Sequence, residues 1–305
     1  MSVAANEHEL LQRIESLSRP LAPEPTGVRP KRWSPVVGIR AVLFDVYGTL
    51  FISGVGDISI GNAESDEQVA RDALTAAGWH GNRLSEEIKV TRLFEEAIRK
   101  THDRLRSAGI QYPEVDVLAI WKEVLEQLPR SVVAGGITEA GLHTLAVDYE
   151  FHVNPVWPMP GLKQTLTALH RQGLVLGLVS NAQFYTPMMF QALLGETLPA
   201  LGFELSCCAF SYRMGEAKPS TRIFQQALDK LAGKNGIKPS QTLYVGNDML
   251  KDIWPAQRLG CRTVLFAGDR RSLRLRQDDE RCAGAKPDCV IMDLRRLEQL
   301  LTGLI

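Results

Sequence analysis

Residues 40–50 of this 305-residue chain read Arg-Ala-Val-Leu-Phe-Asp-Val-Tyr-Gly-Thr-Leu, and this stretch is the most informative part of the sequence. The apolar run from Ala41 to Phe44 predicts a buried strand, since a short apolar run that ends in a glycine-containing turn is typical of a parallel sheet. Asp45 follows where that strand should end. Because ligands bind at the carboxyl ends of strands in open parallel sheets, we expect this carboxylate to serve chemistry rather than packing.

Three later segments also place polar side chains beside predicted elements. Residues 175–181 (Val-Leu-Gly-Leu-Val-Ser-Asn) end an apolar strand in a hydroxyl, and residues 216–219 (Glu-Ala-Lys-Pro) put a lysine before a helix that starts with proline. Residues 242–252 (Thr-Leu-Tyr-Val-Gly-Asn-Asp-Met-Leu-Lys-Asp) follow a strand with two carboxylates four residues apart. With residues 45–49, these segments resemble motifs I to IV of the haloacid dehalogenase-like (HAD) hydrolase superfamily, and the resemblance covers most of the chain.

Helices and strands alternate along the second half of the chain, which predicts right-handed crossovers and a parallel sheet. Between residues 66 and 149 the apolar spacing is helical and predicts four helices, which matches the cap that many HAD hydrolases insert after motif I. The other predicted elements are helices near 7–17, 162–172, 220–232, 250–259 and 294–303, and strands near 174–180, 205–210, 241–246, 262–266 and 288–292. We therefore expect an α/β fold with a Rossmann-like parallel sheet core and a helical cap domain inserted after the first strand.

The chain is expected to divide into three parts. An N-terminal arm spans residues 1–38, the catalytic core combines 39–62 with 153–305, and the cap spans 63–152. The arm joins a short polar helix to a proline-rich extended segment, since proline removes a backbone donor and resists helix formation. We expect the arm to act as a tether without catalytic duty.

Composition excludes several kinds of partner. With 35 basic and 35 acidic residues, no global field attracts nucleic acid or an anionic membrane, and no stretch approaches the roughly twenty apolar residues of a membrane span. The five cysteines form no Cys-x-x-Cys pair, which disfavours zinc, and reduced thiols favour a cytoplasmic protein. The charged run at 269–281 nearly cancels its own charge and predicts a solvated loop. The oligomeric state stays open.

The resemblance to HAD hydrolases implies a role for each motif residue. Asp45 would be the nucleophile that forms an aspartyl intermediate. Thr49 and Ser180 would offer hydroxyls to the nucleophile or to a phosphoryl oxygen, with Asn181 beside them in motif II. Lys218 would neutralise the charge that gathers when a small anionic substrate approaches Asp45.

Asp248 and Asp252 carry the metal prediction. Two carboxylates that point into one crevice suit a hard cation such as Mg²⁺, although an isolated pair of this kind is more often a pair of helix N-terminal acids stabilised by the helix dipole. The family context favours the metal. By the same resemblance Mg²⁺ would be held by Asp45, by the backbone carbonyl of Tyr47, and by Asp248 and Asp252.

Tyr47 makes the reaction ambiguous. HAD phosphatases usually carry a second Asp at this position, which protonates the leaving group and then activates water, whereas haloacid dehalogenases usually carry Tyr. A phenol with a pKa near 10 is a poor general base at neutral pH, so motif I leans toward dehalogenation. The Asp248 and Asp252 pair leans toward phosphatase. The leading hypothesis is a Mg²⁺-dependent phosphatase acting on a small phosphomonoester; the alternatives are a 2-haloacid dehalogenase and a catalytically weak binding or regulatory protein.

Overall fold

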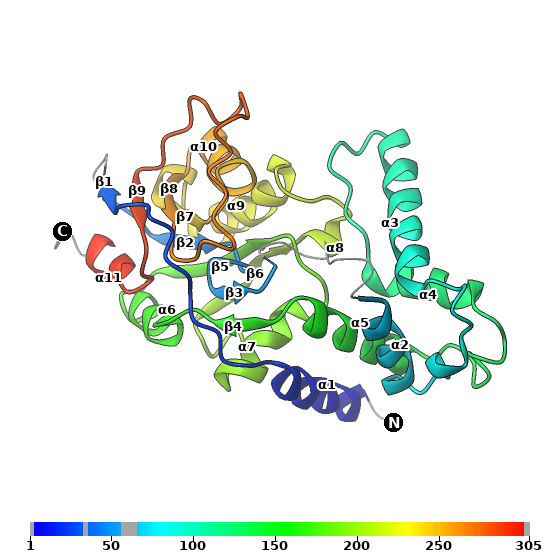
Figure 1. The fold of residues 1–305 in the computed structure, drawn as a ribbon. Helices are drawn as coiled ribbons and strands as arrows, with labels where there is room; N and C mark the ends of the chain where they lie inside the picture. Colours follow the sequence, from blue (N-terminus) through cyan, green and yellow to red (C-terminus); the bar gives the residue numbers. More distant parts are fainter. Residues whose placement is uncertain (1–2, 33–35, 56–65, 302–305) are drawn as a thin grey trace.

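The computed structural model describes residues 3–32, 36–55 and 66–301, and a seven-stranded sheet lies at its centre (Figure 1). The strand order is β1-β9-β8-β7-β2-β5-β6, in which β1 is antiparallel to β9 and the other neighbours are parallel. The strands of this sheet are β1 (Lys31–Arg32), β2 (Ala41–Phe44), β5 (Val175–Ser180), β6 (Phe203–Phe210), β7 (Thr242–Gly246), β8 (Arg262–Phe266) and β9 (Cys289–Ile291). The predicted α/β fold with a Rossmann-like parallel core is confirmed.

Helices cover both faces of the sheet. Because side chains alternate along a strand, Val42 and Phe44 pack into one cluster and Ala41 and Leu43 into another. The first cluster is shared with α6, α7 and α11, and the second with α9 and α10. The helices of the core are α6 (Leu162–Arg171), α7 (Thr186–Leu194), α8 (Ser211–Met214), α9 (Thr221–Asn235), α10 (Trp254–Arg258) and α11 (Arg296–Leu301), with a 3-10 turn at Pro239–Gln241 and a π-helical turn at Met249–Ile253.

A helical insertion leaves the core through a small second sheet. Strands β3 (Phe51–Ser53) and β4 (Val156–Pro158) pair antiparallel, and the insertion lies between them. Its helices are α2 (Asp66–Ala76), α3 (Val90–Ser107), α4 (Val117–Gln127) and α5 (Glu139–Val153), with a 3-10 turn at Gly81–Arg83. Figure 1 shows α2, α3 and α4 grouped beside one end of the sheet. The expected boundary between core and cap near residue 62 falls outside the described residues.

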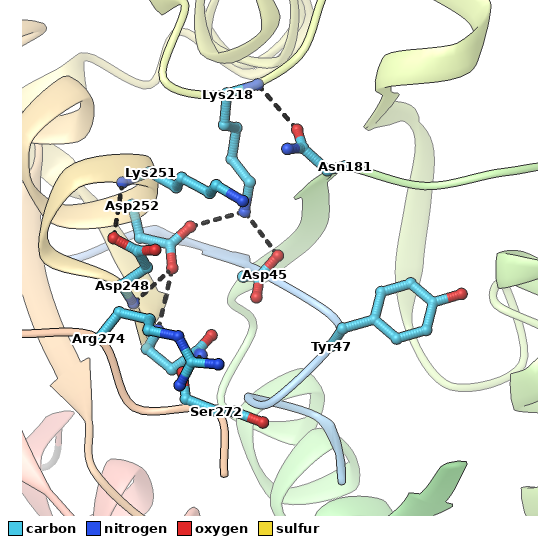
Figure 2. A pocket seen from close by; sticks show the side chains of 10 residues that line it. Asp45, Tyr47, Asn181, Lys218, Asp248, Lys251, Asp252, Ser272 and Arg274 are labelled. Carbon is cyan, nitrogen blue, oxygen red and sulfur yellow. Dashed lines mark hydrogen bonds and ion pairs between the residues drawn. The ribbon is translucent and has the colours of Figure 1, made fainter. Parts of the chain in front are cut away.

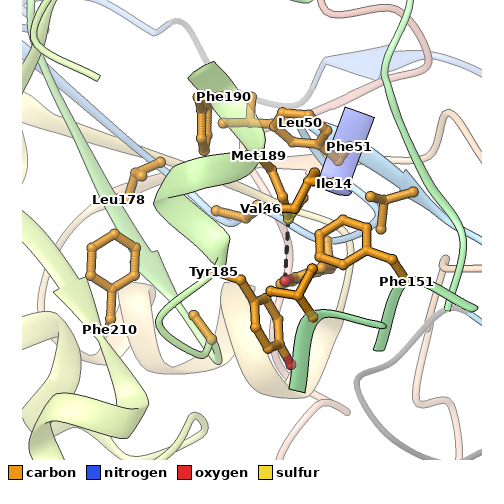
Figure 3. Packing of buried hydrophobic residues seen from close by; sticks show 14 of the residues in the cluster. Ile14, Val46, Leu50, Phe51, Phe151, Leu178, Tyr185, Met189, Phe190 and Phe210 are labelled. Carbon is orange, nitrogen blue, oxygen red and sulfur yellow. Dashed lines mark hydrogen bonds between the residues drawn. The ribbon is translucent and has the colours of Figure 1, made fainter. Parts of the chain in front are cut away.

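The N-terminal segment is anchored at both of its ends. Helix α1 (Val3–Leu17) packs on α5 and α7, and its Ile14 is fully buried among the aromatic side chains of the core (Figure 3). Nη1 of Arg13 lies 2.6 Å from Oδ2 of Asp148. At the other end, β1 adds an antiparallel strand to the edge of the central sheet. The arm is therefore integrated into the fold rather than attached at a single point.

Several elements were not predicted, among them β1, α8, α7 and the β3–β4 pair. Helix α7 is rich in apolar residues, so it lacks the polar face that marks an amphipathic helix. The pairing of β3 with β4 joins segments about a hundred residues apart, which a local pattern does not reveal.

All five cysteines are free and buried, and within the described ranges no helix is long and apolar enough to cross a membrane.

Candidate active site

Three adjacent parallel strands bring the motif residues to one edge of the sheet. Phe44, the last residue of β2, is opposite Leu178 of β5 and Val245 of β7. The backbone N–H of Asp45 extends this ladder by donating to the carbonyl of Val245 at 2.9 Å. The residues that follow these strands therefore emerge together, as expected at the carboxyl edge of a parallel sheet.

The centre of the site is a buried chain of charges formed by Asp45, Lys218 and Asp252 (Figure 2). Nζ of Lys218 lies 2.6 Å from Oδ1 of Asp45 and 2.6 Å from Oδ1 of Asp252. All three side chains are buried. Burial by itself would lower the pKa of Lys218, but Asp252 and Asp45 raise it above its ordinary value, so the amine stays charged.

Motif II and the neighbouring strand hold Lys218 in place. The side-chain oxygen of Asn181 accepts a hydrogen bond from the backbone N–H of Lys218 at 2.8 Å. The hydroxyl of Tyr244 on β7 lies 3.4 Å from Nζ and donates to Oδ1 of Asp252 at 3.1 Å. The lysine is thus fixed by contacts at both its backbone and its side chain.

Two hydroxyl groups flank Asp45. Oγ of Ser180 lies 3.4 Å from Oδ1 of Asp45, and Oγ1 of Thr49 lies 3.4 Å from Oδ2. Thr49 also donates to Oδ1 of Asn247 at 3.0 Å, so it links the turn after β2 to the turn after β7. The bonds to Asp45 are long, which leaves its carboxylate held mainly by Lys218.

The two motif IV carboxylates differ in their surroundings. Oδ2 of Asp252 accepts from the backbone N–H groups of Asn247 and Asp248 at 3.0 and 2.9 Å, while its other oxygen contacts Lys218. Burial raises the pKa of Asp252 to about 6, against the opposing effect of Lys218, so it is ionised above neutral pH. Asp252 therefore holds both the turn at Asn247 and Asp248 and the side chain of Lys218 in place by hydrogen bonds.

Asp248 lies at the start of the following helical turn. Its Oδ1 accepts from the N–H groups of Leu250 and Lys251, and Nη2 of Arg276 lies 2.6 Å from its Oδ2. Burial would raise the pKa of Asp248, but Arg276 and these amides hold it below its usual range. Asp248 therefore carries a negative charge at the edge of the cavity.

Tyr47 is turned away from Asp45, as Figure 2 shows. Its hydroxyl lies 3.0 Å from Oγ1 of Thr186 and 3.4 Å from Sδ of Met189, both on α7. The side chain is buried among the apolar residues of the main core cluster. Burial, and then the charge of Glu150, raise the pKa of Tyr47 well above 10, so the phenol stays protonated. Its hydroxyl has a structural partner and does not face the other motif residues.

A small cavity of about 40 Å³ connects these groups. It is lined by Asp45, Tyr47, Asn181, Lys218, Asn247, Asp248, Lys251, Asp252, Ser272 and Arg274. Thr49 and Ser180 contact Asp45 from behind this lining. The sequence analysis did not single out Asn247, Lys251, Ser272 or Arg274. Asn247 and Lys251 could have been found from their places within motif IV.

Ser272 and Arg274 had no such signal, because they lie in the charged run expected to be a solvated loop. In the structure this run folds back over the site: Asp269 and Ser272 are buried, and Arg276 pairs with Asp248. The expectation of a solvated loop was therefore wrong for Asp269 and Ser272, whereas Arg270 and Leu275 are exposed. Asp269 and Arg271 pair with each other, while Arg270 and Arg276 pair with Glu24 and Asp248 outside the run.

Gly48 makes the close approach of this loop possible. Its φ is 81°, in the left-handed region that favours glycine. A Cβ added there would clash with Cβ of Ser272 and lie 2.7 Å from Nδ2 of Asn247. The turn after β2 and the loop at 272 therefore pack without space for a side chain.

The donor set of the cavity fits Mg²⁺. The carboxylates of Asp45 and Asp248 line the same small space, and carboxylate oxygens are the ligands this ion prefers. Across the ranges 3–32, 36–55 and 66–301, no three His, Cys, Asp or Glu side chains gather as a metal cage. Mg²⁺ characteristically uses one or two carboxylates together with water and substrate phosphate, so two carboxylates suffice for such a site.

Comparisons with known proteins agree with the fold and its motifs. The family model of the haloacid dehalogenase-like hydrolases matches residues 39–260. The chain is 28% identical over 243 residues to a glyceraldehyde 3-phosphate phosphatase of Methanopyrus kandleri, covering 79% of this chain and 90% of the relative. It is 26% identical over 268 residues to a phosphoglycolate phosphatase of Pseudomonas fluorescens, covering 85% and 78%.

Among solved structures, the fold is similar to that of a 2-haloacid dehalogenase from Pseudomonas syringae pv. Tomato. The TM-score is 0.54 at 22% sequence identity, and the match covers 88% of this chain and 100% of the other. A likeness at this identity concerns the fold alone. The family match, which spans most of the chain and all four motifs, shows that the protein belongs to the haloacid dehalogenase-like hydrolase family.

Proposed function

We propose that the protein is a Mg²⁺-dependent phosphatase that acts on a small phosphomonoester with Asp45 as its nucleophile. One observation carries the proposal: Asp45, held by the buried cation of Lys218, shares a cavity with a second carboxylate, Asp248. That arrangement suits an anionic substrate bound together with a divalent cation. The names of the relatives, a glyceraldehyde 3-phosphate phosphatase and a phosphoglycolate phosphatase, point to the same class of reaction.

In the proposed reaction, a carboxylate oxygen of Asp45 attacks phosphorus. A new O–P bond forms as the bond to the leaving oxygen breaks, and water then hydrolyses the aspartyl phosphate to release phosphate. Lys218 orients the nucleophile and offsets the negative charge that builds up around phosphorus. When bound, Mg²⁺ would add positive charge beside the phosphoryl group, with Asp45, the Tyr47 carbonyl and Asp248 as its protein ligands.

Asp252 is assigned a supporting part in this scheme. Both of its oxygens already accept hydrogen bonds from the protein, from Lys218 and Tyr244 on one side and from two backbone N–H groups on the other. We therefore propose that it positions the buried Lys218 and the motif IV turn. Asp248 would contact the cation through Oδ2 in exchange for Arg276, a partner that is one-third exposed.

The orientation of Tyr47 has a consequence for the choice of substrate. A buried, protonated phenol that bonds to Thr186 and Met189 gives no proton to a leaving group near Asp45. Loss of acid and base assistance typically costs roughly 10²–10⁴-fold in rate. Phosphate esters with good leaving groups should therefore turn over best.

The motif at residues 45–49 supports a second candidate function, that of a 2-haloacid dehalogenase. Asp-Val-Tyr-Gly-Thr is the pattern of haloacid dehalogenases, and displacement of halide from carbon needs no protonated leaving group. The same Asp45 would attack carbon and form an ester that water hydrolyses. A binding or regulatory protein of the same fold is the third possibility.

A paired assay separates these functions. Phosphate release from 4-nitrophenyl phosphate and chloride release from 2-chloropropionate are measured with Mg²⁺ and with a chelator. The variants are Asp45→Asn and, as a matched control, Asp103→Asn, an exposed carboxylate of α3. We expect Mg²⁺-dependent phosphate release that Asp45→Asn abolishes and the control preserves.

Two other results would redirect the assignment. Chloride release that persists in chelator would identify a dehalogenase. Binding of Mg²⁺ or of a phosphate analogue without turnover across a broad substrate panel would instead indicate a regulatory role. Phosphate release that survives Asp45→Asn would refute the nucleophile assignment.

A further inference from the structure

Two segments outside the matched family region, which spans residues 39–260, lie against each other near the proposed active site. One is the extended part of the N-terminal arm, residues 18–32, called the strap below. The other is the loop that follows β8, residues 267–276, called the wall loop. The strap is fixed on both sides, because α1 packs on α5 and α7 and β1 pairs with β9.

The strap and the wall loop are joined by hydrogen bonds. The backbone N–H of Arg270 donates to the carbonyl of Glu24 at 2.9 Å, and Nη2 of Arg271 donates to the carbonyl of Ala22 at 2.6 Å. The N–H of Glu24 donates to Oδ1 of Asp269 at 3.3 Å. Arg271, whose side chain is partly exposed, also pairs with the buried Asp269, at 2.9 Å between Nη2 and Oδ2. Arg271 therefore links the two segments, together with the ion pair between Arg270 and Glu24 at 2.7 Å and the hydrogen bond from Oγ1 of Thr26 to the carbonyl of Ala267 at 3.0 Å.

The wall loop is joined in turn to the cavity. Nδ2 of Asn247 donates to the carbonyl of Ser272 at 2.6 Å, and the N–H of Arg274 donates to the carbonyl of Asn247 at 3.0 Å. The N–H of Met249 donates to the carbonyl of Arg274 at 2.9 Å. These bonds fix the loop against motif IV, while Ser272 and Arg274 line the cavity itself.

We infer that the strap, acting through Arg271, positions the wall loop as one side of the active site. Arg271 is absent from the cavity lining, so it is a positioning residue rather than a catalytic one. Its guanidinium ties the anchored strap to a loop whose next residues hold Asn247 and pair with Asp248. The catalytic part of this inference rests on the proposed phosphatase function, but the mechanical part does not.

The test compares Arg271→Ala with a control of the same local pattern. Asp293 and Arg295 repeat the two-residue spacing of Asp269 and Arg271, but their ion pair lies on the surface. Arg295→Ala therefore removes an equivalent pair without touching the strap. Arg271→Lys is the conservative variant, since lysine keeps the charge but not the planar fork that bonds two partners at once.

Two readouts are measured on the full chain. The first is hydrogen exchange of peptides covering residues 246–251 and 269–276, which needs no turnover. The second is kcat and KM for 4-nitrophenyl phosphate. We expect Arg271→Ala to speed exchange in both peptides and to lower kcat by about 10- to 100-fold, since small displacements of a positioned group cost rates of this order. Arg271→Lys should recover part of both effects, and Arg295→Ala should change neither.

Several results would overturn the inference. Unchanged exchange at 246–251 in Arg271→Ala would show that the strap does not hold the motif IV turn through Arg271, whether or not the enzyme turns over. Faster exchange with unchanged kcat would show that the wall loop does not matter for the reaction. If the wild type has no turnover, the proposed function fails separately, and exchange alone decides whether the strap positions the site.

Discussion

Replacement of Lys218 by methionine probes the centre of the site with little change in side-chain volume. In the wild type, one buried ammonium lies 2.6 Å from a carboxylate oxygen of both Asp45 and Asp252. Removing the cation leaves two carboxylates buried without a charged partner. Breaking a buried pair in this way costs roughly 3–5 kcal/mol of unfolding free energy. We expect Lys218→Met to lose a stability of this size at pH 7, together with its activity.

The loss of unfolding free energy in Lys218→Met should grow as pH rises. Without Lys218, the pKa of at least one carboxylate rises well above the roughly 3.9 of an unfolded aspartate, so the folded variant holds a proton that the unfolded chain has released. Stability then falls as pH rises, by up to about 1.4 kcal/mol per pH unit for each such proton. Asp252, with a pKa of about 6, is already ionised in the wild type above pH 7. Between pH 7 and 8.5 the variant should therefore lose about 1–2 kcal/mol more than the wild type.

Urea unfolding followed by tryptophan fluorescence measures both effects. Lys163→Met is the matched control, because Lys163 forms an exposed pair with Glu196 at 2.6 Å and such pairs contribute roughly 0–1 kcal/mol. A deficit below about 1 kcal/mol for Lys218→Met at pH 7 would refute the reasoning, since it falls within the range of a surface pair. So would a deficit that does not change with pH.

Three further substitutions test other parts of the site. Tyr47→Phe removes one buried hydrogen bond and should cost about 1 kcal/mol in urea unfolding with kcat unchanged, whereas a large loss of kcat in the folded variant would show that the hydroxyl takes part in the reaction. Gly48→Ala should lower both kcat and thermal stability, because its φ of 81° and the nearby Ser272 leave no place for a Cβ; wild-type values would contradict that packing. Arg276→Ala frees Asp248 from its guanidinium partner, so titration calorimetry should report tighter Mg²⁺ binding than in the wild type, and unchanged or weaker binding would exclude competition at this carboxylate.

The fold was predictable because its signals are local. Short apolar strands that end in polar residues, each followed by a helix, identify a parallel sheet and the edge where its ligands bind. The structure confirmed the predicted α/β core, and the family model confirmed the predicted family. Helix α7 was not predicted, because an element with few polar residues has no amphipathic period. The pairing of β3 with β4 was not predicted, because the two strands are distant in sequence.

The sequence alone indicated the family and the motif residues that follow the strand ends, since strand ends and motif spacings are local properties. Tertiary structure decided what each of them touches. Tyr47 turns toward α7 through contacts with residues about 140 positions away. Asp248 and Asp252 differ in their ionic partners, because Asp248 pairs with Arg276 and Asp252 pairs with Lys218. The N-terminal strap bonds to a loop about 250 positions further along the chain. Side-chain direction and pairing depend on such long-range contacts, and no periodicity of the sequence encodes them.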